Sequence, residues 1–379
     1  MSLETFLAEK PLYYTQIDYT RMPRAYASIK DKLPLPKIIH LVGTNGKGTT
    51  GRFIANALVM LGQNTGHYTS PHVSEFNERI WKNGKNVSYD ILEEAHQKLL
   101  SILPVEFQES LSYFEYTTFL AIVVYEKCDY IVLEAGLGGE HDATNVFDRV
   151  LSVITPIGLD HEDFLGHTIE EIALTKLRSV RNKAIISKQG FEKVLVVAKS
   201  LEDDTIQFIQ HKDILNEELI SLSKEISSEK EMPHYLQENL LTAMASVQEL
   251  GFKIKKNLFN FPSLEGRMQR IKPNVWLDLG HNALAAEAIS HCFDAKSINL
   301  VYNSYKDKDY MSILRLLSPI IKKVEILPIE NNRVVPRQDL VDAIIKNGLE
   351  YKTFEGIEKD EQYLVFGSFS VAEAFTKFC

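Results

Sequence analysis

A short apolar run followed by a glycine-rich loop and a helical pattern constrains the fold of this chain most. The run is Ile38 to Val42, and the loop after it reads Gly43-Thr44-Asn45-Gly46-Lys47-Gly48-Thr49-Thr50. Glycines let successive backbone N–H groups turn toward a polyphosphate, and the N-terminus of the following helix adds partial positive charge. Lys47 can then reach the terminal phosphates, and the Thr49 hydroxyl can coordinate Mg²⁺. The pattern predicts a nucleotide-binding P-loop at residues 43–49, because a plain glycine-rich turn would not explain Lys47 and Thr49.

Strand-like runs alternate with segments of helical period along the chain. Before residue 261 these segments are Ile38–Val42, Thr50–Leu61, Tyr130–Leu133, Val150–Ile154, Thr168–Val180 and Tyr235–Leu250. The strand-like runs are apolar on successive residues, as expected of central strands in a parallel sheet that is covered by helices. Residues 200–231 are rich in charge and serine and are predicted to be a solvated excursion. The fold class is therefore predicted to be α/β.

A second, smaller α/β unit is predicted after a stretch without sustained period at residues 261–274, which contains Gly266 and Pro273. Its strand-like runs are Val275–Leu277, Ile298–Val301, Val324–Leu327 and Tyr363–Phe366. No repeat at a solenoid period is visible, and the two units do not resemble each other.

Composition argues against several classes of protein. The chain has 42 Lys and Arg against 51 Asp and Glu, a net charge of -9, so no nucleic-acid surface is predicted. No apolar stretch approaches the roughly 18 residues that a membrane span needs, and the first ten residues lack a signal-peptide pattern. Three widely spaced cysteines, Cys128, Cys292 and Cys379, do not fit a disulfide framework or a zinc site. We therefore expect a cytoplasmic protein with small-molecule substrates and without nucleic-acid or membrane partners.

Further motifs follow the P-loop in order. Before residue 261 they are Thr69-Ser70-Pro71-His72, Phe76-Asn77-Glu78-Arg79-Ile80, Leu133-Glu134-Ala135-Gly136-Leu137-Gly138-Gly139, Asp142-Ala143-Thr144-Asn145-Val146 and Ile157-Gly158-Leu159-Asp160-His161. After it come Asp278-Leu279-Gly280-His281-Asn282, Asp307-Lys308-Asp309 and Gly367-Ser368. With the spelling of the P-loop, this series resembles the folylpolyglutamate synthase and dihydrofolate synthase branch of the Mur ligases over nearly the whole chain.

The resemblance implies an ATP-dependent ligase of folate biosynthesis and polyglutamylation. ATP would phosphorylate the carboxylate of dihydropteroate, of a folylglutamate, or of both, and L-glutamate would attack the acyl phosphate. It also implies a P-loop ATPase domain with a mostly parallel sheet at residues 1–268 and a smaller, Rossmann-like glutamate-binding domain at residues 269–379. The short segment from the loop to Ser70 resembles the bifunctional bacterial forms, and we expect a monomer.

The same resemblance assigns residues to the chemistry. Lys47, His161, Lys176 and His281 would be catalytic. One Mg²⁺ would be held by Thr49 and Glu134, with Ser70 nearby, and a second by Ser70, Glu134 and His161. Glu134 ends an apolar strand, where ligands meet a parallel sheet, although an ordinary strand-end acid is the alternative. Lys176 stands where this family has a lysine that is carbamylated by CO₂, and a solvated helical lysine is the alternative.

Nucleotide and substrate contacts are assigned in the same way. The ATP-binding residues would be Gly43, Thr44, Asn45, Gly46, Lys47, Gly48, Thr49, Asn239, Arg267, Asp278 (on ribose) and His281 (on a phosphate). The substrate-binding residues would be Pro71, His72, Asp142, Ala143, Lys308, Asp309 and Ser368. Because Lys308 and Asp309 begin a predicted helix, helix capping is the alternative for these two.

The chain departs from the family pattern at several positions. Glu140-His141 replaces Arg-Leu before Asp142. This reversal of charge predicts that the substrate is bound differently there. Thr175-Lys176-Leu177-Arg178 replaces Glu-Lys-Ala-Gly. Glu265 replaces a proline near Arg267, and Tyr235-Leu236 replaces His-Gln before Asn239.

Two rival functions remain open at this point. A cell-wall Mur ligase would carry an additional N-terminal domain for UDP, whereas only about 35 residues precede the P-loop strand. A P-loop ATPase that acts as a regulatory switch would not need glutamate for turnover and would give no role to His161, Lys176 or His281.

Overall fold

The computed structural model describes residues 1–11, 18–260 and 264–378. Cys379 and the first part of the predicted boundary stretch, 261–263, lie outside these described residues. The chain divides into two compact units: Met1–Ile157, Asp163–Ile226 and Glu238–Pro262 form the first, and Gly158–Glu162, Ser227–Gln237 and Ser263–Cys379 form the second. The domain limits predicted at residues 268 and 269 stay a prediction.

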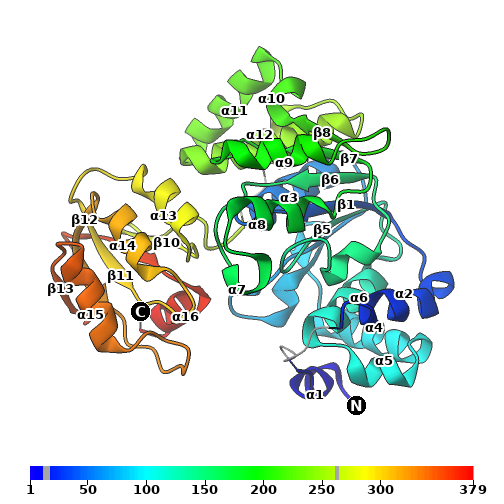
Figure 1. Cartoon of the computed structure of the whole chain (residues 1–379), viewed down its shortest axis with the longest axis horizontal. Helices are drawn as coiled ribbons and strands as arrows, with labels where there is room; N and C mark the ends of the chain where they lie inside the picture. The colour runs from blue at the N-terminus through cyan, green and yellow to red at the C-terminus, as the bar shows by residue number, and fades with distance from the viewer. Residues whose placement is uncertain (12–17, 261–263, 379) are drawn as a thin grey trace. The chain divides into compact units, whose positions relative to one another are not determined.

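The first unit is built on a mixed, mostly parallel sheet (Figure 1). In spatial order its strands are β4 (Lys85–Asn86), β3 (Ile80–Lys82), β2 (Thr65–Tyr68), β5 (Tyr130–Glu134), β1 (Lys37–Val42), β6 (Leu151–Ile154), β7 (Lys183–Ile186) and β8 (Gln207–Gln210). Only the pairs β2 with β3 and β3 with β4 are antiparallel. Since β2, β5, β1 and β6 are parallel neighbours, the segments that follow them leave the sheet at one edge.

Helices cover both faces of this sheet. Neighbouring residues of a strand point to opposite sides, so the continuous apolar runs of its central strands place apolar side chains on both faces. A side chain at Gly51 of α3 (Lys47–Met60) would meet Val132, whereas Ile131 and Leu133 belong to a core cluster with α4 (Tyr89–Ile102) and α6 (Tyr113–Tyr125). A second cluster joins α8 (Ile169–Leu177) and α9 (Glu192–Ser200) to the carboxyl ends of β1 and β6. The sheet is therefore buried on both faces, as the continuous apolar runs predict.

The helices up to residue 260 have these bounds: α1 (Leu3–Ala8), α2 (Arg21–Ile29), α3 (Lys47–Met60), α4 (Tyr89–Ile102), α5 (Val105–Ser110), α6 (Tyr113–Tyr125), α7 (Glu162–Leu165), α8 (Ile169–Leu177), α9 (Glu192–Ser200), α10 (His211–Ile214), α11 (Glu217–Glu229) and α12 (His234–Glu249). Short 3₁₀ helices are η1 (Lys30–Lys32), η2 (Phe76–Arg79), η3 (Ala143–Val146) and η4 (Lys256–Phe259).

The second unit has its own sheet, drawn in Figure 1 from yellow to red. In spatial order its strands are β13 (Tyr351–Thr353), β12 (Ile321–Ile326), β11 (Ile298–Tyr302), β14 (Gln362–Phe366), β10 (Val275–Asp278) and β9 (Gln269–Lys272), and only β9 is antiparallel to its neighbour. Its helices are α13 (Ala283–Ser290), α14 (Tyr310–Leu317), α15 (Arg337–Lys346) and α16 (Phe369–Phe378). Helices α13, α14 and α15 share one core cluster with β11, β12 and β14. The predicted α/β class, with a larger and a smaller sheet, is confirmed.

One sequence interpretation is wrong in part. Residues 200–231 do not form only a solvated excursion, because they contain the edge strand β8 and the helix α11. Leu219, Ser223 and Ile226 of α11 are buried at spacings of three to four residues. The stripe is narrow and includes a serine, so it leaves no sustained apolar period in the sequence. No helix within the described ranges is long and apolar enough to cross a membrane.

Candidate functional site

The predicted P-loop joins β1 to α3. Gly46 is the residue before α3 and has φ 83, a left-handed value that favours glycine. A β-carbon at Gly43 would lie 2.0 Å from Thr155 Oγ1, so the loop can pass the end of β6 only without a side chain there. The Thr44 and Asn45 amides donate to the Pro156 carbonyl, at 2.9 and 3.2 Å. The loop is thus tied to the segment that follows β6.

Two lysines meet the first carbonyl of this loop. Lys47 Nζ donates to the Gly43 and Thr44 carbonyls at 3.1 and 3.3 Å, and it lies 3.9 Å from Glu134 Oε1. Lys176, buried in the last turn of α8, donates to the Gly43 carbonyl at 3.0 Å. Glu134 is buried at the end of β5. The structure therefore gathers two cations and a carboxylate, from three separate motifs, at the P-loop.

Thr49 provides the test of whether the site fits a metal ion. Its hydroxyl oxygen is buried and has no hydrogen-bond partner within the ranges that the structure describes. A buried hydroxyl without a partner is costly unless a ligand satisfies it. Within the same ranges no three His, Cys, Asp or Glu side chains gather as a metal site. The ligands predicted for the first Mg²⁺, Thr49 and Glu134, combine a hydroxyl oxygen with a carboxylate instead. A hard cation with oxygen ligands fits the Thr49 position.

We expect Thr49→Val to leave the nucleotide-free protein as stable as the wild type, or more stable by about 1 kcal/mol, because the substitution removes a buried hydroxyl that has no partner. The stabilisation of the protein by Mg·ATP should fall. Thermal unfolding with and without Mg·ATP measures both effects. The matched control is Thr117→Val in α6, whose hydroxyl bonds to Tyr68 and to the Phe114 carbonyl and whose loss should destabilise. Clear destabilisation of nucleotide-free Thr49→Val would contradict the assignment.

The motif after β2 lies at the same sheet edge. Ser70 is half-buried and Pro71 exposed. His72 is half-buried and accepts a 2.8 Å hydrogen bond at Nδ1 from Arg79 Nε. Burial lowers the pKa of His72, and the charge of Arg79 lowers it further, which favours a neutral ring. The roles predicted for these three residues in metal and substrate binding stay predictions.

The carboxylate of Asp142 is fully engaged within its own loop. It accepts hydrogen bonds from the amides of Gly136, Leu137 and Thr144 and from the Thr144 hydroxyl. Burial raises the pKa of Asp142, and these donors oppose the rise. Ala143 is buried in η3. What the structure describes for Asp142 is thus a loop-holding role, and its contact with substrate stays a prediction.

Two departures from the family pattern contact each other. Glu140, which stands where the family has arginine, lies 3.5 Å from Arg178, which stands where the family has glycine. His141 stacks on Tyr19, with ring centroids 4.3 Å apart. The reversed charge beside Asp142 is therefore balanced locally.

Asn239, predicted to contact adenine, is buried on α12 and packs on the P-loop. A β-carbon at Gly46 would lie 2.6 Å from its Oδ1 atom. Glycine at position 46 is thus needed both for the turn and for this close approach.

In the second unit, Asp278 at the end of β10 is also held by protein donors. Its Oδ2 atom accepts the Tyr235 hydroxyl at 2.7 Å and the Met268 amide at 2.9 Å, and its Oδ1 atom accepts the Gly280 amide. Burial, together with Asp278, raises the pKa of Tyr235, so the phenol keeps its proton. Arg267 donates to the Gly266 carbonyl. The nucleotide contacts predicted for Asp278 and Arg267 stay predictions.

Asp160 is the centre of a polar cluster in the second unit. It accepts hydrogen bonds from Lys308 Nζ at 2.7 Å and from Asn282 Nδ2 at 3.0 Å. The Nε2 atoms of His161 and His281 each lie 3.9 Å from its Oδ2 atom. Burial alone would raise the pKa of Asp160, but the charges of His161, Lys308 and His281 outweigh burial and lower it. For His281, burial and then Lys308 lower the pKa. Three predicted site residues thus converge on one carboxylate.

We expect Asp160→Asn to destabilise the second unit by about 3 kcal/mol at pH 7, because it leaves the buried Lys308 charge without its counter-charge. A carboxyl whose pKa is lowered by folding stabilises the fold above its ordinary pKa of about 3.9, so the difference from wild type should shrink as the pH falls below that value. Urea unfolding followed by Trp276 fluorescence, in a Trp81→Phe background, measures this difference. The control Asp307→Asn removes an exposed pair with Arg333 and should cost less than about 1 kcal/mol. A difference that does not change with pH would contradict the Asp160 assignment.

The remaining predicted residues of the second unit cap helices. Asp309 accepts the Ser312 amide at the start of α14, and the Ser368 hydroxyl accepts the Val371 amide at the start of α16. For Asp309 the capping alternative is therefore realised, and a further role in glutamate binding stays a prediction.

Sequence reasoning missed Asp160, although the residue stands in the Gly158 to His161 motif. The family resemblance assigns a metal-binding role to His161 of this motif and no role to Asp160. The signal that could have found Asp160 is its place beside His161, in a motif whose partners Asn282 and Lys308 stand in two other motifs.

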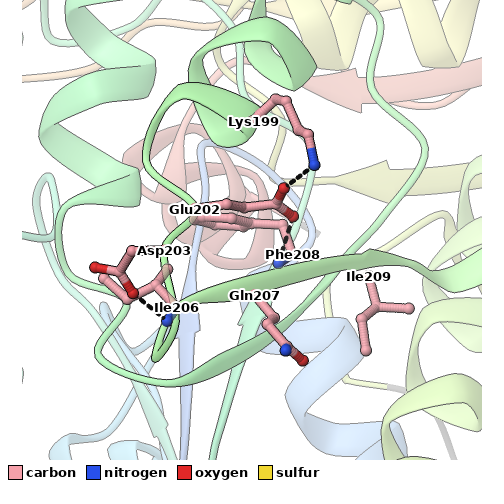
Figure 2. Close-up of a pocket in the computed structure, with 7 residues that line it drawn as sticks. All are labelled: Lys199, Glu202, Asp203, Ile206, Gln207, Phe208 and Ile209. Atoms are coloured by element: carbon pink, nitrogen blue, oxygen red, sulfur yellow. Dashed lines mark hydrogen bonds and ion pairs between the residues drawn. The ribbon is translucent and has the colours of Figure 1, made fainter.

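A surface hollow of about 440 Å³ lies away from these residues, at the edge strand β8 (Figure 2). Figure 2 shows that its charged side chains are already engaged, since Glu202 pairs with Lys199 and accepts the Phe208 amide, and Asp203 accepts the Ile206 amide. No predicted site residue within the described ranges lines this hollow.

Several known proteins are similar to this chain in sequence and in structure. No family model matches the chain. It is 30% identical to the dihydrofolate synthase/folylpolyglutamate synthase of Haemophilus influenzae, over 92% of this chain and 91% of that protein. The crystal structure of Helicobacter pylori folylpolyglutamate synthetase is 39% identical, with a TM-score of 0.79, and the match covers 99% of this chain and 97% of that one. The Mycobacterium tuberculosis folylpolyglutamate synthase complexed with ADP has a TM-score of 0.82 over 99% of this chain and 97% of that one, but at 24% identity it shows the fold alone.

Proposed function

This chain belongs to the dihydrofolate synthase/folylpolyglutamate synthase family, and we propose that it uses its P-loop site to add L-glutamate both to dihydropteroate and to folates. As a family member it is an ATP-dependent ligase. A carboxylate oxygen of the acceptor attacks the γ-phosphorus of ATP and releases ADP. The amine of glutamate then attacks the acyl carbon, and phosphate and a proton leave.

The observation that carries the proposal is that Lys47 and Lys176 both donate to the Gly43 carbonyl and that Glu134 lies 3.9 Å from Lys47, in a P-loop whose buried Thr49 hydroxyl has no partner among the described residues. Two polyanions must meet for the first step, so cations have to offset their repulsion. Lys47 would hold the terminal phosphates, and Thr49 and Glu134 would be ligands of Mg²⁺. Bound there, Mg²⁺ would neutralise charge on the transferred phosphoryl group. Ser70, Glu134 and His161 as ligands of a second Mg²⁺ stay a prediction.

Carbamylation of Lys176 belongs to the same proposal. The amine is buried, and its contact with the Gly43 carbonyl places it beside the phosphate loop. Reaction of the neutral amine with CO₂ would form a carbamate and release a proton, replacing a cation by an anion that can hold metal. A carbamate carbon signal after incubation with ¹³C-bicarbonate, absent from Lys176→Arg, would support this. No difference between the two proteins would overturn it.

The test of the function is phosphate release from Mg·ATP with L-glutamate, comparing dihydropteroate, tetrahydrofolate and no acceptor, with products weighed by mass spectrometry. Turnover with both acceptors, each gaining one glutamate, is expected. Turnover with one acceptor would reject the dual activity. Phosphate release that ignores acceptor and glutamate would favour the switch-like ATPase instead. A monomeric state and a cytoplasmic location stay predictions from the sequence.

A further inference from the structure

Arg149, between η3 and β6, is a buried cation that no predicted role used. Its guanidinium donates to His40 Nδ1, to the side chain and carbonyl of Asn145, and to the Phe147 and Ser179 carbonyls, at 2.7 to 3.0 Å. All of these acceptors are uncharged. The neighbouring Asp148 is exposed and pairs with Arg181. Burial lowers the pKa of Arg149 only to about 10, so the side chain keeps its charge at neutral pH.

This cation fixes the protons of the neighbouring side chains. Arginine can only donate, so His40 Nδ1 must accept. Burial, and then Arg149, hold the pKa of His40 well below its ordinary value, so the ring is neutral and its proton sits on Nε2. His40 Nε2 lies 2.8 Å from Thr144 Oγ1 and therefore donates to it. The Thr144 hydroxyl donates in turn to Asp142 Oδ1. Arg149 therefore sets the direction of each hydrogen bond in the series from Arg149 through His40 and Thr144 to Asp142.

The two ends of this series lie at functional segments of the first unit. At the anionic end, Asp142 accepts the Gly136 and Leu137 amides, which belong to the turn that follows Glu134. At the cationic end, Arg149 holds the Ser179 carbonyl just beyond α8, the helix that carries Lys176. His40 lies on β1, three residues before the P-loop. This series of hydrogen bonds therefore reaches the segments that carry Lys176, Glu134 and the P-loop.

We propose that Arg149, His40, Thr144 and Asp142 act as one relay, defined by these four side chains, and that Arg149 is a positioning residue for the ligation site. It acts through His40 and Thr144 on the turn after Glu134, and through Ser179 on the end of α8. The proposal rests on the proposed ligase function and adds a residue whose hydrogen bonds, given above, go to none of the predicted ATP-binding or metal-binding residues.

A double-mutant cycle tests whether the relay acts as a unit. We expect Arg149→Met and Thr144→Val each to lower kcat for glutamate ligation by about 10- to 100-fold, as small displacements of reacting groups do. The kcat of the double variant should lie within about threefold of the kcat of the less active single variant, because either substitution interrupts the same series of hydrogen bonds. The KM for ATP should change less than about twofold. Losses that multiply in the double variant would overturn the proposal.

Arg181→Met is the matched control, since Arg181 donates to the same Asn145 carbonyl but is exposed and lies outside the relay. It should keep kcat within about threefold of wild type. An equal loss in Arg181→Met would assign the effect to the loop as a whole. If Arg149→Met does not fold, Arg149→Lys and the isosteric Thr144→Val carry the same cycle.

The ¹⁵N resonances of the His40 ring provide a measurement that needs no turnover. In the wild type we expect a neutral ring with hydrogen on Nε2 and none on Nδ1, assigned by its absence from His40→Gln. Arg149→Met should lose this single tautomer, whereas Arg181→Met should keep it. A protonated Nδ1 in the wild type, or an unchanged ring in Arg149→Met, would overturn the relay even if ligation is normal. A correct tautomer in a protein without glutamate-dependent turnover would reject the function and not the relay.

Discussion

Lys47→Ala is expected to abolish ATP-dependent ligation of glutamate, with a fall in turnover of about a thousandfold or more, the size of effect seen when a cation is removed from a transferred phosphoryl group. The reason is the position of Nζ between the P-loop carbonyls and Glu134. Without this amine, no side chain at position 47 offsets the charge of the terminal phosphates. Initial rates of glutamate-dependent phosphate release measure the effect.

The control for Lys47 is Lys37→Ala, at the opposite end of the same strand. Lys37 is exposed at the start of β1, and its amine lies over the Tyr130 ring. Its removal should leave turnover within about threefold, because the active edge of a parallel sheet is the carboxyl edge. Near-normal ligation by Lys47→Ala would remove the P-loop from the mechanism.

Glu134→Gln is expected to have the second largest effect. The substitution keeps the size of the side chain and removes the charge 3.9 Å from Lys47. If Glu134 is a Mg²⁺ ligand, turnover should fall by about a hundredfold or more, and the Mg²⁺ concentration for half-maximal rate should rise. A Mg²⁺ titration of initial rates at saturating ATP separates these two effects.

Asp129→Asn controls for loss of a carboxylate on the same strand. Asp129 precedes β5 and accepts the Asn64 amide, at the end of the strand away from the P-loop. Its substitution should leave the Mg²⁺ dependence unchanged. An unaltered Mg²⁺ profile in Glu134→Gln would count against the ligand role of Glu134 and leave the ordinary strand-end acid as the better reading.

The α/β class was predictable, because the central strands of both sheets are short runs of consecutive apolar residues. The predicted runs at Ile38, Tyr130 and Ile298 all became buried parallel strands. One exception is α11, whose buried stripe is narrow. A helix that buries only a narrow stripe needs few apolar residues, so its period is weak in the sequence.

The candidate site was predictable only as a set of motifs. The order of the motifs names Lys47, Glu134 and Lys176, but sequence distance does not say which atoms meet. That Lys176 joins Lys47 on the Gly43 carbonyl depends on how α8 packs beside the P-loop. Lys176 and Gly43 stand 133 positions apart in the chain.

The sequence by itself determined the α/β class, the P-loop and the family pattern, because these depend on local periodicity and on residue types at short spacing. Only the tertiary structure decided that Asp160 gathers Lys308, Asn282 and two histidines, and that Arg149 is linked through His40 and Thr144 to Asp142. A buried charge is stable only where other groups pair with it, and for Asp160 and Arg149 some of these groups stand on distant segments of the chain. Those partners are a property of packing, which no single segment of the sequence contains.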